Sequence, residues 1–562
     1  MPIPQKNSKF FSFLFAIIAT TSSFSQSNNL SNNQIEIHTA IKIIVGDTGF
    51  SEIEAIAIQN GYIIKTGNLS ELQKWYPQSK IIKHKGVMYP GLIDAHCHFL
   101  AYCKGSTELN VYGANSPEKI AKLAKKFSKK TKRTWVVGRG WDQNLWGKDF
   151  PNSAQLKNAG NKPVCLSRVD GHAVWVNDIA LQQLNLNWDT LIYGGEIIKD
   201  SQGKPTGIFI DNAADWIKSF IPPVDEKTLE KSVVKHAKDC YKYGLTTLDE
   251  AGLELNEIQF IDRLQKENKL PMRFYTMLSA NENSLKAIVT HNLPRSERLT
   301  CHSMKIYFDG ALGSRGALLK NQYCDRHDHF GLRLIKPEEF NLYSSILLQQ
   351  NFQVCVHAIG DSANALVLKS FKQLIPEGYD ARWRIEHAQI VDPRDQQIFS
   401  QRSIIPSVQP THATSDASWA NDRLCADGKQ RVYGGKLYDP KTGAYAYQSL
   451  LKSSGILALG TDFPVEAINP FATFYSATER KDLSGTLASP FKPEQALTRK
   501  QAFLGMTLWA AYANREDQVK GSLEEGKYAD FIILNHDILS VETDKLKKTK
   551  VKKTFIGGRR VY

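Results

Sequence analysis

Gly91-Leu92-Ile93-Asp94-Ala95-His96-Cys97-His98 is an apolar segment that ends in two closely spaced histidines. In a strand, alternate side chains share a face, so His96 and His98 would point to one side while Cys97 points away. Two imidazoles on one side suit the coordination of a single metal ion. Ionisable residues at the carboxyl end of a strand are typical of barrel active sites. The segment therefore predicts a barrel strand with a metal centre at its end.

Short apolar segments alternate with helical ones through the middle of the chain, a pattern that favours a parallel sheet. We predict eight strands, at residues 87–94, 245–251, 272–277, 304–308, 354–357, 383–387, 404–409 and 456–461. Eight parallel strands are the number that a closed (β/α)₈, or TIM, barrel requires. The predicted fold class is therefore α/β, with a barrel over residues 87–518.

The two ends of the chain have a different pattern of apolar and polar residues. Residues 33–86 alternate apolar and polar positions around an Asn60-Gly61 turn, and residues 519–562 contain further strand-like segments. These patterns predict antiparallel hairpins, and we expect both ends to form one small, discontinuous β-sandwich domain beside the barrel. Residues 100–244 are far longer than an ordinary strand-to-helix connection. We interpret them as an inserted lid or substrate-pocket subdomain.

Residues 1–25 have the features of a secretory signal peptide. Lys6 and Lys9 precede an apolar run at 10–19, and small residues follow at 20–25. This order is typical of exported proteins, and the run is too short for a comfortable membrane span. We predict a periplasmic or secreted protein that begins shortly after Ser25 and has no integral membrane span in its mature form.

Composition narrows the function classes. The chain is 42% hydrophobic and 23% charged, as is usual for folded proteins. Its net charge of +14 owes much to the N-terminal segment and to residues 545–553, where no aromatic residues are interleaved, so we expect a solvated face and no nucleic-acid partner.

The eight cysteines form no CxxC pair, which predicts mostly buried thiols, with Cys103 or Cys324 as candidates for pairing. The oligomeric state is left open, a homo-oligomer included.

Four further ionisable side chains fall at the ends of predicted strands: Lys305 of the fourth, His357 of the fifth, His387 of the sixth and Asp462 just after the eighth. The carboxyl ends of barrel strands meet at one mouth, so these side chains should converge with the two histidines of the first strand. Imidazole nitrogen and carboxylate oxygen suit zinc and similar ions. Glu386, beside His387, is expected to orient a neighbouring imidazole.

The ordered set HxH, Lys, His, His and Asp on strands one, four, five, six and eight resembles the amidohydrolase superfamily. Four motifs narrow the resemblance to amidohydrolase family 3, the branch of the N-substituted formamide deformylases: Gly138-Arg139-Gly140-Trp141-Asp142, Asp170-Gly171-His172, Asp309-Gly310-Ala311-Leu312-Gly313-Ser314 and Ser407-Val408-Gln409-Pro410. The resemblance covers nearly the whole chain after the predicted signal peptide. It implies a metal-dependent hydrolase that binds one or two divalent ions, with Zn²⁺ expected.

The resemblance also implies a two-metal arrangement of the ligands. His96 and His98 would bind the more buried ion, and His357 and His387 the more exposed one. Lys305, converted to a carbamate by carbon dioxide, would bridge the two ions. If Lys305 stays an ammonium, its charge opposes a second cation and the site holds one ion.

Asp462 would touch the bridging hydroxide and shuttle protons, so the resemblance implies that Asp462 and Lys305 are catalytic as well as metal ligands. One departure lies in the second strand, where Asp249-Glu250 replaces the common His-Asp and would add a ligand or alter the pocket. Six residues are candidates for binding substrate: Trp141, Asp142, Arg168, His172, Arg315 and His412.

The chemistry that these residues predict is hydrolysis of a non-peptide C–N bond, amide-like, N-formyl or N-acyl, in a small molecule. Hydrolysis of an ester, lactone or phosphoester on the same site is an alternative, because the same activated water attacks each of them. A binding protein that retained the fold without catalysis is a further alternative. Loss of a central residue would have favoured that alternative, and all six are present.

Overall fold

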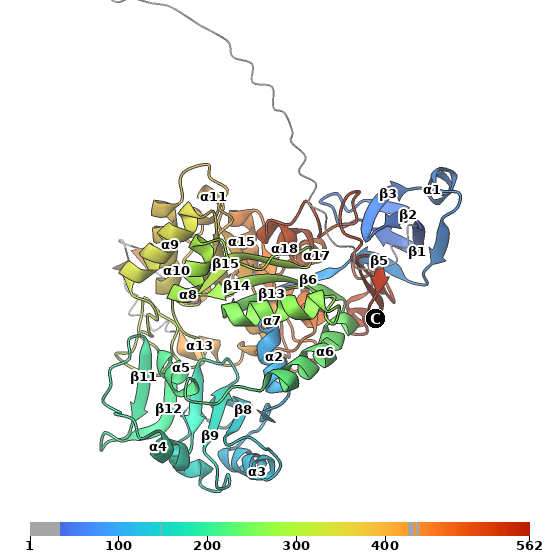
Figure 1. Ribbon diagram of the computed structural model, residues 1–562. Coiled ribbons are helices and arrows are strands. Elements are labelled where there is room, and N and C mark those ends of the chain that lie inside the picture. The colour runs from blue at the N-terminus through green and yellow to red at the C-terminus, as the bar shows by residue number, and fades with distance from the viewer. Residues whose placement is uncertain (1–33, 148, 425–431, 434–435, 438) are drawn as a thin grey trace, which may run out of the picture. The chain divides into compact units, whose positions relative to one another are not determined.

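The computed structural model describes residues 34–562, except residues 148, 425–431, 434–435 and 438 (Figure 1). The predicted signal peptide, residues 1–25, lies outside the described residues. Three large sheets organise the described chain: an eight-stranded parallel sheet, an eight-stranded sheet built from both ends, and a six-stranded sheet in the insertion. Within the described ranges, no helix combines the length and apolar character needed to cross a membrane.

The central sheet confirms the predicted barrel class. Its strand order is β21-β18-β17-β16-β15-β14-β13-β6, and every neighbouring pair is parallel. The strands are β6 (Leu92–Cys97), β13 (Leu245–Leu253), β14 (Arg273–Ser279), β15 (Leu299–Tyr307), β16 (Gln353–Ala358), β17 (Arg384–His387), β18 (Ile405–Val408) and β21 (Ala458–Leu459). Each overlaps one of the eight predicted segments. Most of their side chains are buried, as expected for a parallel sheet covered on both faces.

The first predicted strand is in fact two. Residues 87–94 divide at Gly91 into β5 (Val87–Pro90), which belongs to the terminal sheet, and β6 of the barrel. A side chain at Gly91 would come within 2.3 Å of Thr246, so only glycine fits where the chain crosses between the sheets. Apolar residues run through both strands without a break, which is why the sequence pattern does not separate them.

Contacts between β6 and the residues that follow β21 join the two outer strands of the barrel sheet. Asp94 accepts hydrogen bonds from the backbone N–H and the hydroxyl of Thr461, at 2.8 and 2.7 Å. A Cβ on Gly460 would lie 2.5 Å from the backbone nitrogen of His96. The sheet is therefore nearly closed, and a glycine is needed where its edges approach.

Helices that follow the strands cover the barrel (Figure 1). The longer ones are α6 (Glu226–Lys242), α7 (Leu255–Lys266), α8 (Glu282–Val289), α9 (Pro337–Gln349), α10 (Asp361–Leu374), α15 (Tyr447–Ser454) and α16 (Pro470–Glu479). In α6, Asp225 caps the N-terminus through the Thr228 N–H, and Val233, Ala237 and Cys240 form the buried face. Two short helices, α17 (Arg499–Gly505) and α18 (Leu508–Ala513), end the barrel, and α18 packs on β6 and β21.

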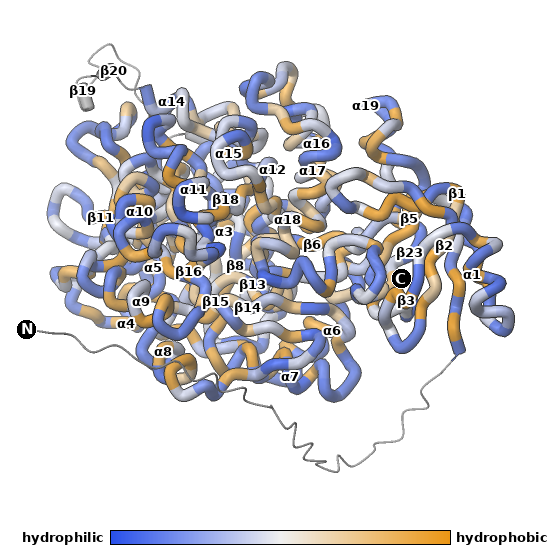
Figure 2. Tube along the Cα trace, turned by 90° about the horizontal axis from the view of Figure 1, so that it is seen from above, coloured by the Kyte–Doolittle hydropathy of each residue, from blue (hydrophilic) through white to orange (hydrophobic). Residues whose placement is uncertain are grey.

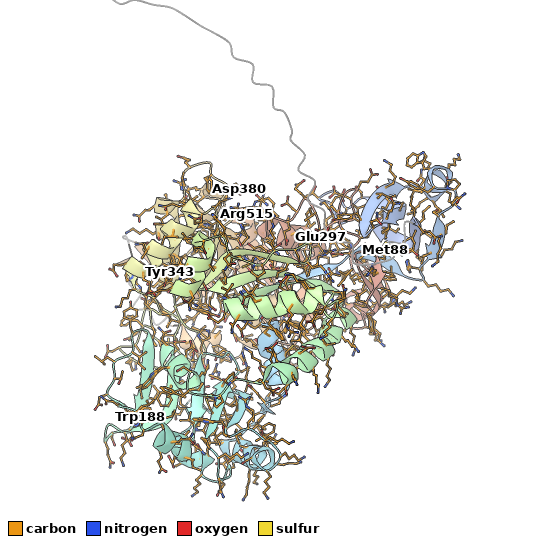
Figure 3. The ribbon with its side chains drawn as sticks, in the orientation of Figure 1. Met88, Trp188, Glu297, Tyr343, Asp380 and Arg515 are labelled. Atoms are coloured by element: carbon orange, nitrogen blue, oxygen red, sulfur yellow. The ribbon has the colours of Figure 1, made fainter. Side chains whose placement is uncertain are left out.

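The terminal sheet joins the two ends of the described chain in the order β24-β23-β22-β5-β1-β2-β3, with β4 paired to β1. Its strands are β1 (Glu36–Ile44), β2 (Glu52–Gln59), β3 (Tyr62–Gly67), β4 (Lys80–Lys83), β22 (Phe531–Leu534), β23 (Val551–Ile556) and β24 (Arg559–Arg560), besides β5. Apolar and polar residues interleave along these strands (Figure 2). Side chains from both ends share one core, in which Ile56 and Met88 meet Phe531 and Phe555 (Figure 3 labels Met88). Both ends of the described chain therefore contribute strands to one sheet and side chains to one core.

The insertion after β6 forms a subdomain with its own sheet, in the order β11-β12-β10-β9-β8-β7. Its elements include α3 (Pro117–Ser128), β7 (Leu109–Asn110), β8 (Val136–Trp141), β9 (Val164–Arg168), β10 (Ala173–Val176), α4 (Asp178–Leu184), β11 (Gly195–Lys199), β12 (Pro205–Asp211) and α5 (Asn212–Lys218). Two apolar clusters lie on it, one around Trp141 and Trp175 and one that includes Trp188 (Figure 3). The subdomain therefore has a hydrophobic core of its own.

Buried thiols are the rule among the cysteines that the structure describes, as predicted. Cys97, Cys103, Cys165, Cys240, Cys301 and Cys355 are buried and free. Cys324 is disulfide-bonded. Of the two candidates for pairing, only Cys324 is therefore bonded.

Candidate metal centre

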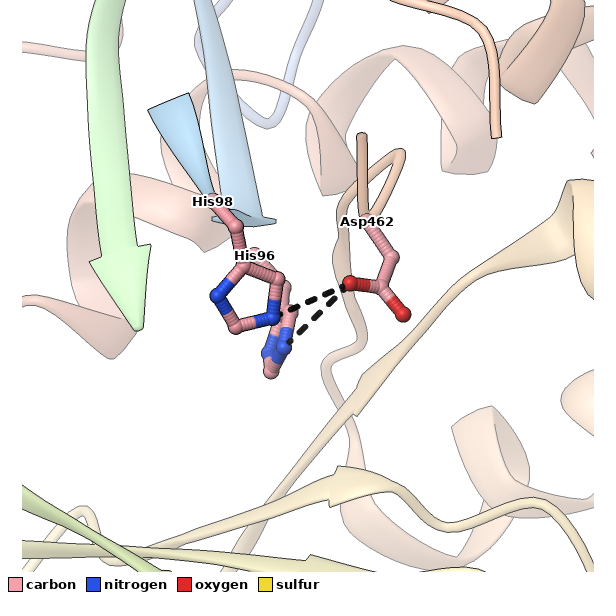
Figure 4. Close-up of side chains that lie close together, drawn as sticks. All are labelled: His96, His98 and Asp462. Atoms are coloured by element: carbon pink, nitrogen blue, oxygen red, sulfur yellow. Dashed lines mark ion pairs between the residues drawn. The ribbon is translucent and has the colours of Figure 1, made fainter. Parts of the chain in front are cut away.

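The ends of β6 and β21 bring three side chains of metal-ligand type together (Figure 4). Asp462 Oδ1 lies 3.3 Å from His98 Nε2 and 3.8 Å from His96 Nε2. That oxygen is buried, yet it has no hydrogen-bond partner among the described residues. Ligand atoms of the three residues all lie within 4.8 Å of one another, a spacing that can hold one metal ion.

Glu386 orients the imidazole of His96. Its Oε2 lies 2.6 Å from His96 Nδ1, and its Oε1 lies 2.7 Å from Arg384 Nε. Burial alone would raise the pKa of Glu386, but Arg384 and His96 lower it to about 2, so the carboxylate stays ionised. A carboxylate on one ring nitrogen leaves the other free for a metal, which is the usual support of a ligating histidine. This is the orienting contact expected of Glu386.

A second group shares Asp462. His412 Nε2 lies 3.5 Å from Asp462 Oδ2, and His387, His412 and Asp462 form another set whose ligand atoms lie within 4.8 Å. His387 Nδ1 lies 2.7 Å from Gln409 Oε1, so Gln409 orients this ring as Glu386 orients His96. The sequence marked His412 only as a substrate contact and did not single out Gln409, although Gln409 stands in the quoted Ser407-Val408-Gln409-Pro410 motif.

His357 and Lys305 complete the cluster. The ring centroids of His357 and His387 lie 4.6 Å apart, and His357 Nε2 lies 3.4 Å from the carbonyl oxygen of Gly310. Lys305 Nζ lies 3.2 Å from His96 Nε2. The six central residues named from the sequence are thus gathered at one end of the barrel.

The protonation states of the clustered side chains suit the binding of a metal cation. Burial lowers the pKa of His96 to about 4, with a smaller effect from Lys305, and it lowers the pKa of both His357 and His387 well below the usual value. Burial alone would raise the pKa of Asp462, but the neighbouring imidazoles hold it well below its usual range. Metal ligands must be neutral imidazole and ionised carboxylate. Together with the unpartnered Asp462 Oδ1, this donor set fits a divalent ion such as zinc.

Two of the clustered residues have strained backbones. His387 and Asp462 adopt left-handed conformations, with φ of 73° and 59°. Such conformations are uncommon for residues other than glycine and are found at sites where the surrounding structure holds them. Each lies just after or at the end of its strand, where the chain turns away from the barrel and the side chain enters the cluster.

A cavity of about 470 Å³ opens above the cluster, within the range of small-molecule sites. It is lined by His98, Lys305, His357, His387 and Asp462 from the barrel and by side chains of the inserted subdomain. Four of the six candidate substrate residues line it: Asp142, Arg168, His172 and His412. The insertion therefore contributes side chains to the lining of the cavity.

Trp141 and Arg315 do not line this cavity. Trp141 is fully buried in the core of the inserted subdomain and donates its indole N–H to the Leu166 carbonyl at 2.7 Å. The register of β8 against β9 shifts between Arg139 and Trp141, and this irregularity directs the two side chains differently. Arg315 forms an ion pair with Asp325 at 2.9 Å.

The Asp249-Glu250 departure lies outside both groups of ligand-type residues. Asp249 binds Arg384 at 3.0 Å and Asn514 at 2.6 Å. Glu250 accepts hydrogen bonds from the backbone N–H groups of Phe99 and Leu100, at 2.5 and 3.0 Å, at the start of α2 (Phe99–Gly105). These carboxylates therefore hold the helix and the strands around the site.

Residues 85–562 match the sequence profile of the amidohydrolase family. The chain belongs to this family. A putative amidohydrolase, YtcJ, of Bacillus subtilis (strain 168) is 30% identical over 91% of this chain and 96% of its own length. N-substituted formamide deformylase of Arthrobacter pascens is 22% identical over 90% of this chain and 94% of its own. The protein is therefore related to metal-dependent hydrolases along almost its whole length.

Two solved structures resemble the fold. An uncharacterized metal-dependent hydrolase of Pyrococcus horikoshii superposes with a TM-score of 0.71 at 24% identity, over 91% of this chain and 99% of its own. An adenosine deaminase of Xanthomonas campestris, solved with bound zinc, reaches a TM-score of 0.52 at 12% identity, over 93% and 92%. At these identities the likeness concerns the fold alone.

Proposed function

We propose that the protein hydrolyses a non-peptide C–N bond, amide-like, N-formyl or N-acyl, in a small molecule. The observation that carries this proposal is the unpartnered Asp462 Oδ1 between His96 and His98, below a cavity of small-molecule size. Family membership supports metal-dependent hydrolysis. The formamide deformylase among the relatives favours a C–N bond.

Two sets of residues would hold the metal. His96, His98 and Asp462 form one group, and His387, His412 and Asp462 form the other. His357 lies beside His387, and Lys305 lies beside His96. When bound, a divalent cation, which we expect to be zinc, supplies Lewis acidity toward the carbonyl oxygen and lowers the pKa of water. The hydrogen bonds that Glu386 and Gln409 accept from His96 and His387 keep these rings in the orientation that binding needs.

Asp462 is the group that we expect to move the proton. Its carboxylate is ionised and lines the cavity, so it can accept a proton from the attacking water. Delivery of that proton to the leaving nitrogen completes the cleavage and restores the carboxylate. His412, 3.5 Å from Asp462 Oδ2, lies where it would contact the substrate or steady this carboxylate.

Lys305 is the residue that we expect to be carbamylated. Burial lowers the pKa of its amine to about 8, which makes the neutral amine accessible. The neutral nitrogen attacks the carbon of carbon dioxide and releases one proton, which leaves an anionic carbamate. The change from cation to anion would remove the repulsion between the Lys305 ammonium and a second metal ion.

Metal analysis combined with a substrate panel tests the proposal. The purified, metal-loaded protein is offered N-formyl, N-acyl and cyclic amides beside esters, lactones and phosphoesters of matched size. Release of amine from the amide set supports the proposal. Turnover confined to the oxygen esters would assign the site to the esterase or phosphoesterase alternative, and a flat response without bound metal would indicate a binding protein.

We also propose that the protein is exported, on the order of charged, apolar and small residues in 1–25. Fractionation of the native cells followed by N-terminal sequencing tests this. A mature chain that begins shortly after Ser25, outside the cytoplasm, is the expected result. Recovery of intact Met1 in the cytosol would contradict it.

A further inference from the structure

One cationic side chain on the wall of the cavity has no acidic partner. Arg139, on β8 of the inserted subdomain, lines the cavity beside His98 and Asp462. Its Nη2 donates to the Val169 carbonyl at 2.9 Å, and its Nε is buried without a partner. Within the described ranges, no carboxylate lies within 4.0 Å of its guanidinium nitrogens.

The other charged groups that the insertion places in this cavity are paired. Arg168 binds both Asp142 and Asp170, and Lys218 binds Asp215 and the Gly171 carbonyl. Asp211 is paired with His172 at 2.7 Å. Of the lining carboxylates outside the insertion, Asp416 accepts a hydrogen bond from Tyr445 and Glu466 accepts one from Ser415. Among the cationic side chains that the insertion contributes to the cavity, Arg139 is therefore the one without a carboxylate partner in the described part of the chain.

The surroundings of Arg139 place it near the reaction centre. Tyr112 lies between Arg139 and the Asp462 loop, because its ring packs against Gly140 and its hydroxyl donates to the Pro464 carbonyl at 2.6 Å. A Cβ on Gly171 would lie 3.4 Å from Arg139 Nη2, and Gly171 has φ of +84°. The guanidinium thus lies against the backbone at Gly171. Pro464, whose carbonyl accepts from Tyr112, follows Asp462 by two residues in the sequence.

We infer that Arg139 binds a carboxylate group of the substrate, so that the preferred substrates are N-formyl or N-acyl derivatives of amino acids or other carboxylic acids. The inference rests on the proposed function for the bond that is cleaved. A guanidinium offers a planar fork of N–H donors that matches a carboxylate in a bidentate manner. A buried donor without a partner, such as Arg139 Nε, is satisfied when an acceptor binds.

Matched acids and amides test the inference on the metal-loaded protein. The probes are N-formyl-phenylalanine and N-formyl-phenylalaninamide, which differ only in the charge at one end. The wild type should favour the acid, and Arg139→Met should raise KM for the acid on the order of 10²-fold while leaving the amide almost unchanged. Arg139→Lys keeps the positive charge and loses the forked set of N–H donors. Its KM for the acid should lie between the values of the wild type and of Arg139→Met.

Lys199→Met is the matched control, because it removes one positive charge from the same subdomain at an ion pair with Asp189 outside the cavity. It should leave the preference for the acid as in the wild type. Equal KM for acid and amide in the wild type would overturn the inference, as would equal losses on both probes in Arg139→Met.

Binding without turnover separates this inference from the proposed function. Thermal unfolding is followed with phenylacetate, phenylacetamide and phenyl phosphate. If neither formyl probe is hydrolysed but phenylacetate stabilises the wild type and not Arg139→Met, the carboxylate site stands and the proposed reaction fails. No stabilisation by phenylacetate, or stronger stabilisation by phenyl phosphate, would overturn the carboxylate assignment.

Discussion

The backbone N–H of Asp462 donates a hydrogen bond to the carbonyl of His96 across 2.8 Å. One bond thereby joins the end of the barrel's last strand to the end of its first. Because the side chains of the same two residues belong to one candidate metal group, closure of the barrel and assembly of the site depend on the same contact. Changes at this junction should affect stability and metal binding together.

Gly460→Ala tests that junction. A Cβ at this position would lie 2.5 Å from the His96 nitrogen, so β21 and β6 must move apart. We expect a loss of about 1–3 kcal/mol in unfolding free energy, the usual cost of overpacking, together with weaker metal binding. Denaturant titration and metal analysis measure the two effects. Gly105→Ala is the control, because nothing lies within 4 Å of its Cβ position. A similar loss of stability and metal binding in this control would show that the close approach at Gly460 is not the cause.

His96→Ala and His357→Ala should each lower metal content, because an incomplete ligand set binds a cation less tightly. Removal of an outer partner alone costs 10–100-fold in affinity, so we expect losses of roughly 10²-fold or more. Stoichiometry is measured on the purified variants. His236→Ala, which changes a histidine paired with Asp239 outside the cavity, should retain the wild-type content. Unchanged content in both test variants would mean that the ligands are assigned wrongly.

Asp462→Asn should keep the fold and most of the metal but lose turnover by about 10²–10⁴-fold, the usual contribution of general acid–base catalysis. The amide preserves size while it removes the group that accepts and returns the proton. Melting temperature, metal content and kcat are measured together. Near-normal kcat in a metal-replete variant would contradict the proton-transfer role. Asp462 would then serve only to cap the loop after its strand through local hydrogen bonds, many of which Asn can also make.

Lys305→Ala should lose most activity and regain part of it with added acetate or propionate, because a small carboxylate can occupy the place of the carbamate. Sodium chloride at the same ionic strength is the control and should restore nothing. Mass spectrometry of the native protein supplies the second readout, as a gain of one carbon dioxide. A bare lysine together with a single bound metal would contradict the bridging role.

Local sequence patterns sufficed for much of the fold and the candidate site. Apolar runs marked all eight barrel strands, since a buried parallel strand needs such a run wherever it lies in the chain. The ligand-type residues stood at strand ends, so His96, Lys305, His357, His387 and Asp462 could be named before any contact was known. Resemblance to the family narrowed the chemistry further. The boundary at Gly91 was missed because it depends on which sheet each half of the run joins.

The roles of the inserted residues required the tertiary structure. Arg139 and Trp141 stand in one short motif, yet a register shift between them sends Trp141 into a core and leaves Arg139 on the cavity wall. His412 lies in α12 (Pro410–Ser415), and only the tertiary structure brings it to Asp462. The sequence by itself determined the eight barrel strands, the fold class and six of the clustered ligand-type residues, because these follow from local periodicity and residue chemistry. Tertiary structure alone decided pairing, burial and which cation lacks a partner, because each depends on groups distant in the chain.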